Sequence, residues 1–269
     1  MAIKNLNKID QLNWVEYAER IREQQPVIFL PVGALEQHGP HLPMNCDEVI
    51  PREISEEVAK NINGLVAPSL SYGYKSQPRT GGGNHFPGTT SLSAEAMITS
   101  VRDVIMEFAR HGARRIVLMD GHSENTMFII EGVDLALKEL SRDSVADIKI
   151  LRIGSYEFTS SETEKIVWPD GFPSWPLEHA GVMETSVMLY GRPELVDMSK
   201  LPTDIPAQFP PYDVYPVSFD NLPNFHVQER SILRKSQLLR KVSFCLMNMW
   251  REYPTQLPTN SIWTDNVHT

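Results

Sequence analysis

The sequence predicts an α/β fold in which a mostly parallel sheet is covered by helices on both faces. Short apolar runs alternate with longer segments of helical periodicity, and capping or helix-ending residues separate the two. The apolar runs carry few polar residues, as strands buried on both faces do. A chain of 269 residues, of which 41% are apolar, can bury a large core, and we expect residues 1–269 to form a single domain.

The N-terminal part of the chain predicts a helix followed by a buried strand. Asn13 is a suitable N-cap, and four residues recur at helical spacing after it: Trp14, Tyr17, Ala18 and Ile21. The run VIFLPV, residues 27–32, predicts the strand. Pro51 suits the first turn of the next helix, and LVAPSL, residues 65–70, predicts a second short strand.

The middle of the chain continues the alternation. Ser93 is the expected cap of a long helix that ends at Gly112, and four apolar residues share one face of it: Met97, Val101, Ile105 and Phe108. RRIVLMD, residues 114–120, predicts the next strand, residues 125–140 predict the next helix, and IKILRIG, residues 148–154, predicts the strand after it.

The C-terminal part has a different composition. Residues 202–223 are rich in proline and aromatic residues, which predicts an arm packed on the domain or on a neighbouring subunit. Residues 229–250 have the periodicity of a terminal helix.

Composition limits the class of partner. The net charge of −9 disfavours nucleic acid and anionic membranes, so we expect a small metabolite. The sequence contains no apolar stretch of transmembrane length and no signal-peptide pattern at its start, which predicts a cytoplasmic protein. Cys46 and Cys245 are too few for a disulfide framework, and we expect both to be thiols.

Polar residues of the metal-ligand type follow two predicted strands. Glu36, His38 and Asp47 follow the first strand, and His122 and Glu124 follow the third. Parallel sheets bind ligands beyond the carboxyl ends of their strands, where these residues are expected to meet. Each residue alone would be interpreted as a solvated or hydrogen-bonding loop residue. Together, imidazoles and carboxylates in this pattern favour Zn²⁺, Mn²⁺ or a similar ion.

Five ligands are more than one ion needs. If Asp47 bridges two ions, each ion has three protein ligands and keeps open positions for water, as in two-metal hydrolases. A site with one ion and a metal-binding scaffold without catalysis are the alternatives.

Two further segments are candidates for a pocket. Residues 79–90, RTGGGNHFPGTT, lack the lysine and hydroxyl residue of a phosphate-binding loop, and we interpret them as a loop that lines a pocket. In WPLEHAGVMETS, residues 175–186, Glu178 is expected to cap a helix and Glu184 to belong to the core. His179, near the amino end of that helix, should favour the neutral form that accepts a proton.

Five motifs resemble the creatininase, or creatinine amidohydrolase, family. They are PVGALEQHGPH, YGYKSQ, GGGNHFPGTTSL, ARHGARRIVLMDGHSEN and EHAGVMETS, and the similarity extends from about Trp14 to about Pro216. The resemblance implies a three-layer α/β/α fold, a homohexamer and two divalent ions per chain, Zn²⁺ or Mn²⁺. It also implies a division of the ligands: Glu36 and His122 on one ion, His38 and Glu124 on the other, and Asp47 between them.

The same resemblance implies catalytic roles for His179, as proton shuttle, and for Glu124. It places five residues around the substrate: Thr80, Ser123, Tyr156, Trp175 and His179. Pro176 stands where creatininase has a carboxylate that could pair with a guanidine-like group, so this chain lacks that carboxylate. Asp120 adds a negative charge near the metals. Ser123 and Tyr156 replace aromatic walls, which favours a more hydroxylated ligand.

The expected reaction is attack of metal-bound hydroxide on a ring carbonyl of creatinine or a related cyclic amide. His179 would carry the proton to the leaving atom. Cleavage of a carbon–carbon bond in a cyclic keto-inositol, such as 3-dehydro-scyllo-inosose, is the alternative that the family resemblance leaves open.

Overall fold

The computed structural model describes residues 6–143, 147–157, 159–169, 171–172, 178–201 and 215. The strands in these ranges form one sheet in the order β2-β1-β3-β4, and every neighbouring pair is parallel. They are β1 (Ile28–Val32), β2 (Leu65–Val66), β3 (Arg115–Asp120) and β4 (Lys149–Gly154). The predicted parallel sheet is therefore confirmed.

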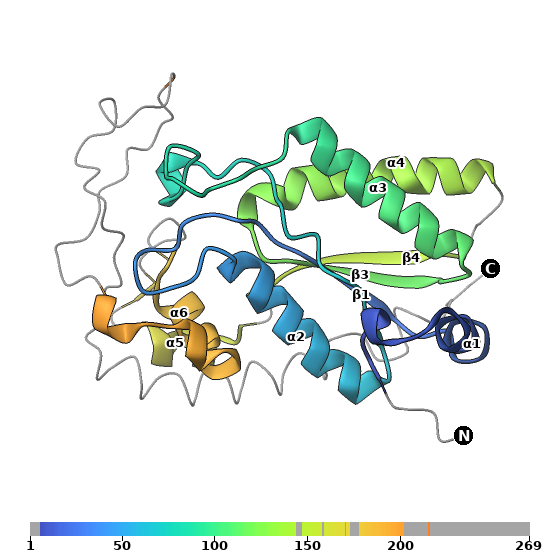
Figure 1. The fold of residues 1–269 in the computed structure, drawn as a ribbon, viewed down its shortest axis with the longest axis horizontal. Helices are drawn as coiled ribbons and strands as arrows, with labels where there is room; N and C mark the ends of the chain where they lie inside the picture. Colours follow the sequence, from blue (N-terminus) through green and yellow to red (C-terminus); the bar gives the residue numbers. More distant parts are fainter. Residues whose placement is uncertain are drawn as a thin grey trace.

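Helices cover both faces of this sheet and make three layers (Figure 1). One face carries α3 (Ala94–Arg110) and α4 (Thr126–Arg142), and the other carries α2 (Cys46–Ile62) and α6 (Val182–Gly191). Two further helices pack at the edges of these layers: α1 (Trp14–Gln24) joins the core of α3 and α4, and α5 (Ser161–Val167) packs against α6.

Alternate residues of β1 enter opposite cores, because successive side chains of a strand point to opposite faces. Ile28, Leu30 and Val32 belong to the core beneath α3 and α4, whereas Phe29 belongs to the core beneath α2 and α6. All residues of β1 are buried. Burial on both faces explains why the strand is a continuous apolar run.

The predicted helix boundaries are mostly confirmed. Asn13 caps α1 through a reciprocal pair of hydrogen bonds with Glu16. Ser93 caps α3 by accepting from the Ala96 N–H, and Gly112 after this helix has a φ of +98°, a left-handed conformation that glycine adopts without strain.

The prediction that Pro51 lies in the first turn of its helix is wrong. α2 begins at Cys46 and contains Pro51 in its interior. A proline there removes the hydrogen bond that its N–H would give to the carbonyl of Asp47, but the helix tolerates this loss near its start. The earlier start places Asp47 on the first turn of α2.

The predicted arm at residues 202–223 lies outside the described residues except for Tyr215, and the predicted terminal helix at residues 229–250 lies outside them entirely. None of the helices in the described ranges is both long enough and apolar enough to span a bilayer.

Candidate active site

Four predicted metal ligands gather beyond the carboxyl ends of β1 and β3. β1 leads into Glu36 and His38, β3 leads through a turn into His122, and α2 contributes Asp47. All four side chains are almost completely buried. Parallel strands end at the same edge of the sheet, which brings these distant segments together.

Asp47 lies between the two histidines. Its Oδ1 is 3.0 Å from His38 Nε2, and its Oδ2 is 3.0 Å from His122 Nδ1. Glu36 Oε1 is 3.1 Å from the same nitrogen of His122. Two atoms that bind one ion at about 2.1 Å each are about 3.0–3.4 Å apart at coordination angles of about 90–110°. The three separations match this range, so the spacing of these side chains is compatible with an ion on each side of Asp47.

Backbone carbonyls orient both imidazole rings. His38 Nδ1 donates to the Glu36 carbonyl at 3.3 Å, and His122 Nε2 donates to the Tyr74 carbonyl at 3.2 Å. In the neutral form of each ring, the remaining nitrogen, which faces Asp47, carries the lone pair that could bind an ion. Hydrogen bonds of this kind fix the tautomer of metal-binding histidines in proteins.

The buried cluster fits positive ions. Three of its atoms make no hydrogen bond of acceptable geometry to any described residue: Glu36 Oε2, His38 Nε2 and Asp47 Oδ2. Burial lowers the pKa of His38 and of His122, but the surrounding carboxylates outweigh it and raise both pKa values well above the usual range. Carboxylates that draw protons onto both imidazoles would equally attract a cation, and this nitrogen and oxygen donor set suits Zn²⁺ or Mn²⁺.

Glu184 lies beside His38, although the sequence was interpreted as placing it in the core. Its Oε2 is 3.7 Å from His38 Nε2 and accepts a hydrogen bond from the Ala180 N–H at 2.6 Å. His38, Glu184 and the buried Cys46 form one of the groups, among the described residues, whose donor atoms are close enough to hold an ion. Burial raises the pKa of the Cys46 thiol, which keeps it protonated and leaves Glu184 as the stronger donor.

Glu124, which the family resemblance assigns to the same ion as His38, contacts His122 and two hydroxyl groups. Its Oε2 is 3.7 Å from His122 Nε2, the ring nitrogen that donates to Tyr74 and faces away from Asp47. Its carboxylate accepts hydrogen bonds from the Thr80 hydroxyl at 2.6 Å and the Ser123 hydroxyl at 2.7 Å. Among the described residues, Glu184 and not Glu124 belongs with His38 to a group of donor atoms close enough to hold an ion.

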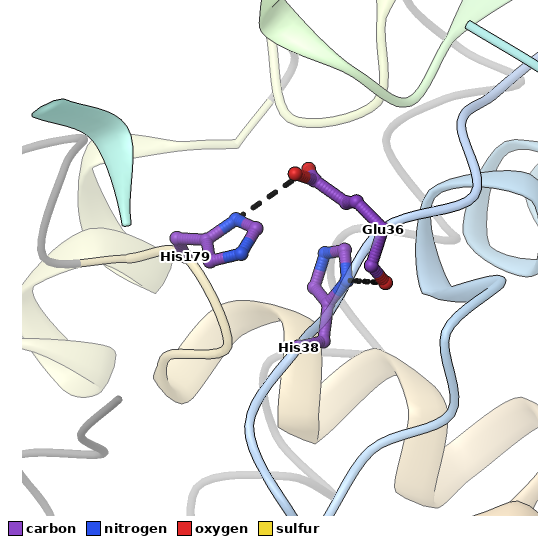
Figure 2. Close-up of side chains that lie close together, drawn as sticks. All are labelled: Glu36, His38 and His179. Atoms are coloured by element: carbon purple, nitrogen blue, oxygen red, sulfur yellow. Dashed lines mark hydrogen bonds and ion pairs between the residues drawn. The ribbon is translucent and has the colours of Figure 1, made fainter. Parts of the chain in front are cut away.

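His179 lies against the cluster, as Figure 2 shows. Its Nε2 donates to the Gln37 carbonyl at 2.8 Å, and its Nδ1 lies 3.7 Å from Glu36 Oε1. Its ring is 4.3 Å from that of His38, measured between centroids. The Gln37 contact of Nε2 leaves the other ring nitrogen, Nδ1, directed toward Glu36.

Glu178, next to it, has the capping role expected from the sequence. Its Oε2 accepts from the Met183 N–H at the start of α6, and its Oε1 accepts from Trp168 Nε1 at 2.7 Å. Burial raises the pKa of Glu178 to about 7.

A cavity of about 280 Å³ adjoins the cluster. Thr80, Ser123 and Tyr156 line it, as does His179, whereas Trp175 and Pro176 lie outside the described residues. The Tyr156 hydroxyl is buried and has no hydrogen-bond partner among the described residues, and burial raises its pKa well above the usual range. It therefore stays a neutral phenol that can donate to a ligand.

The glycine-rich segment at residues 79–90 packs directly on this site. A Cβ at Gly82 would lie 2.4 Å from Glu36 Oε2, so only glycine allows the loop to approach so closely. The Gly83 N–H donates to the Ser76 hydroxyl at 2.7 Å and holds the loop in place. With Thr80 in the cavity wall, the pocket-lining interpretation is confirmed.

Sequence reasoning missed two charged residues in the cavity wall, Arg152 and Glu157. Arg152 of β4 donates to Asp120 Oδ2 and to the Thr126 hydroxyl, at 2.7 Å each. Asp120 Oδ1 in turn accepts from the backbone N–H of His122 at 3.2 Å. The available signal was an arginine inside the apolar run at residues 148–154.

The chain is similar to several known proteins. The family model for creatinine amidohydrolase matches residues 10–234. A creatinine amidohydrolase from Pseudomonas putida is 50% identical over 210 residues, which cover 78% of this chain and 81% of that protein. A 3-dehydro-scyllo-inosose hydrolase from Thermotoga maritima is 29% identical over 179 residues, which cover 66% of this chain and 54% of that protein.

Solved creatininase structures share the fold. A crystal structure of creatinine amidohydrolase (creatininase) matches with a TM-score of 0.83 and 42% identity, and the match covers 94% of this chain and 99% of that chain. Creatininase structures of the same similarity include a manganese form and a Zn-Zn form. The match of the family model over most of the sequence, the shared three-layer fold and the cluster of metal-binding side chains lead to one conclusion: the chain belongs to the creatininase family of hydrolases.

Proposed function

We propose that this hydrolase opens a small cyclic amide, creatinine or a related ring, by adding water to a ring carbonyl. The observation that carries the proposal is the position of Asp47 between His38 and His122 at the end of a small cavity. A cavity of about 280 Å³ suits a single small ring. The 50% identity with the creatinine amidohydrolase of Pseudomonas putida supports this substrate class.

Two divalent ions, Zn²⁺ or Mn²⁺, fit the proposed ligands. Glu36, His122 and Asp47 would hold one ion, and His38, Glu184 and Asp47 would hold the other. When bound, such ions polarise a carbonyl group and lower the pKa of water. Our assignment places Glu184, in place of Glu124, in the second ligand set.

His179 is proposed to move the proton. Its Nε2–H is held by the Gln37 carbonyl, so Nδ1 carries the lone pair that accepts a proton and later returns it to the leaving nitrogen. This nitrogen lies 3.7 Å from Glu36 Oε1, and proton transfer would therefore take place at the edge of the ligand cluster.

Glu124 is proposed to orient the attacking water. Burial raises the pKa of Glu124, but His122 and the hydroxyls of Thr80 and Ser123 outweigh it and lower the pKa below its usual value. An ionised carboxylate held by two hydroxyls accepts a hydrogen bond from water in a fixed direction.

Hydrolysis of a carbon–carbon bond in a cyclic keto-inositol is a second candidate function. Ser123 and Tyr156 place hydroxyl groups on the cavity wall, and the Tyr156 hydroxyl makes no hydrogen bond within the part of the chain that the structure describes. Such groups suit a ring that carries hydroxyls of its own. The relative from Thermotoga maritima supports this alternative.

Turnover and metal content together test the proposal. The protein is loaded with Mn²⁺ or Zn²⁺, and kcat/KM is compared for creatinine, small lactams and keto-inositols. Opening of a cyclic amide with two ions per chain supports the proposed function, whereas cleavage of a keto-inositol alone selects the second candidate. One ion per chain in the active protein rejects the two-ion site. Two bound ions without turnover indicate a metal-binding scaffold.

We further propose that the chain forms a homohexamer in the cytoplasm, as the family resemblance implied. Light scattering coupled to size exclusion measures the mass in solution, and a monomer or dimer would contradict this assembly.

A further inference from the structure

The cavity beside the predicted ligands contains one strongly basic side chain. Arg152 is the only lysine or arginine among the described residues that line it, whereas several carboxyl groups do. Glu36, Asp47 and Glu184 of these belong to the proposed ligand cluster. A guanidinium in such a wall is stable only with anionic partners, and its partners indicate what it can bind.

Asp120 anchors one side of the Arg152 guanidinium. Arg152 Nη2 donates to Asp120 Oδ2 and to the Thr126 hydroxyl. The side chain of Asp120 is completely buried, with a relative exposure of 0%. If the guanidinium moved away, the buried charge of Asp120 would lose its cationic partner. This contact therefore holds the guanidinium in place whether or not a ligand is bound.

Glu157 contacts the other side of the guanidinium. Arg152 Nη1 donates to Glu157 Oε1 at 2.5 Å, and the backbone N–H of Gly154 donates to Glu157 Oε2 at 2.9 Å. One carboxylate therefore joins a guanidinium and a main-chain amide. Such charge-assisted donors are the ones that proteins use to recognise the carboxylates of ligands.

Exposure distinguishes the two acidic partners. The Glu157 side chain is 51% exposed, in contrast to the buried Asp120. An exposed ion pair contributes little to stability, because water replaces the contact when it opens. Glu157 can therefore turn into solvent and leave both donors to another carboxylate, while Asp120 stays in place.

We propose that Arg152 Nη1 and the Gly154 N–H form a carboxylate subsite, which Glu157 fills when no ligand is bound. The substrate is then a small cyclic amide that carries a carboxylate, with its ring extending toward the metal ligands in the same cavity. That the ring is a cyclic amide rests on the proposed function, whereas the carboxylate subsite concerns only ligand binding. Ser123 and Tyr156 alone favour a hydroxylated ring, whereas Arg152 adds a cationic group to the same wall.

A matched pair of ligands tests the subsite. 5-Oxoproline is a lactam with a carboxylate, and 5-oxoprolinamide is the same ring with a neutral carboxamide. Their affinities are measured by titration calorimetry on the full chain loaded with Mn²⁺. We expect the acid to bind at least about tenfold more tightly than the amide, because a hydrogen bond to a charged group changes affinity by roughly ten- to a hundredfold.

Variants on the two sides of the guanidinium make the test specific. Arg152→Met should abolish the preference for the acid. Glu157→Gln removes the charge that competes for the subsite, and it should strengthen binding of the acid by roughly two- to tenfold while the affinity of the amide stays unchanged. Because Arg152→Met leaves Asp120 buried without its partner, the double variant Asp120→Asn/Arg152→Met is the second test, with circular dichroism as a check of folding.

The outcomes separate the subsite from the proposed function. Equal affinities for the two ligands overturn the subsite, and so does a preference for the acid that persists in the double variant, which would place the carboxylate at the metal ions. If a neutral lactam is opened but no preference for the acid over the amide depends on Arg152, the subsite is rejected and the proposed function is kept. Binding of the acid that depends on Arg152, without opening of any cyclic amide, keeps the subsite and rejects the proposed reaction.

Discussion

Replacement of Glu184 by glutamine should remove one of the two ions, whereas the same replacement of Glu124 should remove neither. Glu184 Oε2 lies 3.7 Å from His38 Nε2, close to the separation of about 3.4 Å for two ligands of one tetrahedral ion. Loss of a residue that only orients a ligand weakens metal binding by about 10- to 100-fold, so loss of a ligand should exceed the upper value. Glutamine keeps an oxygen that can accept from the Ala180 N–H, which preserves the local backbone.

Metal content is measured by mass spectrometry after dialysis against buffers that hold free Mn²⁺ or Zn²⁺ just above the dissociation constant of the unaltered protein. Glu184→Gln should then hold one ion per chain. Glu124→Gln is the matched control, because it makes the same chemical change in the same cavity, and it should hold two ions with a lowered kcat. The opposite result, with two ions in Glu184→Gln and one in Glu124→Gln, would refute the ligand assignment from geometry.

Four further predictions concern the bridge, the proton shuttle, a buried histidine and the substrate. Asp47→Ala should lose both ions and all activity, since one carboxylate serves both sites; a single retained ion per chain would contradict bridging. His179→Ala should keep both ions while kcat falls by roughly two to four orders of magnitude, and metal loss would move this residue into the ligand set. Burial, with a smaller contribution from His38, lowers the pKa of His41 to about 4, and its Nε2 lies 3.1 Å from the Thr185 hydroxyl. As the pH is lowered from about 6.5 to about 4, the unfolded chain therefore takes up a proton that the folded chain does not. The free energy of unfolding should decrease over this range by up to about 3 kcal/mol. In denaturant titrations, His41→Gln should show a smaller decrease over the same range. Creatinine should have a kcat/KM about one to two orders of magnitude below that of a more polar ring, because an unpaired polar group on a buried ligand costs about 1–3 kcal/mol; values typical of an efficient enzyme would contradict this.

The sheet and its principal helices could be predicted because their signals are local. The run at residues 27–32 is apolar throughout since both faces of β1 are buried, and Ser93 and Gly112 bound α3 through backbone geometry that neighbouring residues determine. The clustering of Glu36 and His122 followed from the same reasoning, because parallel strands deliver their last residues to a common edge.

The remaining features depend on contacts between distant segments. Glu184 has the spacing of an ordinary residue in the first turn of α6, and only the packing of that helix near the end of β1 brings it to His38. Arg152 interrupts an apolar strand, but its role depends on Asp120 of the neighbouring strand. The start of α2 was misplaced because proline favours the first turn of helices without being confined to it.

The close approach between α2 and the turn after β3 has a consequence for how this site can diversify. A Cβ at Gly121 would lie 2.1 Å from the carbonyl oxygen of Asp47 and 2.7 Å from Pro51 Cγ, so the main chains of the two segments are in contact. The spacing between Asp47 and His122 is thus determined by backbone packing and not by side chains of the cavity wall. Substitutions at wall positions such as Tyr156 can then change which ring is accepted while the ligand geometry stays constant, so chemistry and selectivity in this molecule can evolve at separate residues.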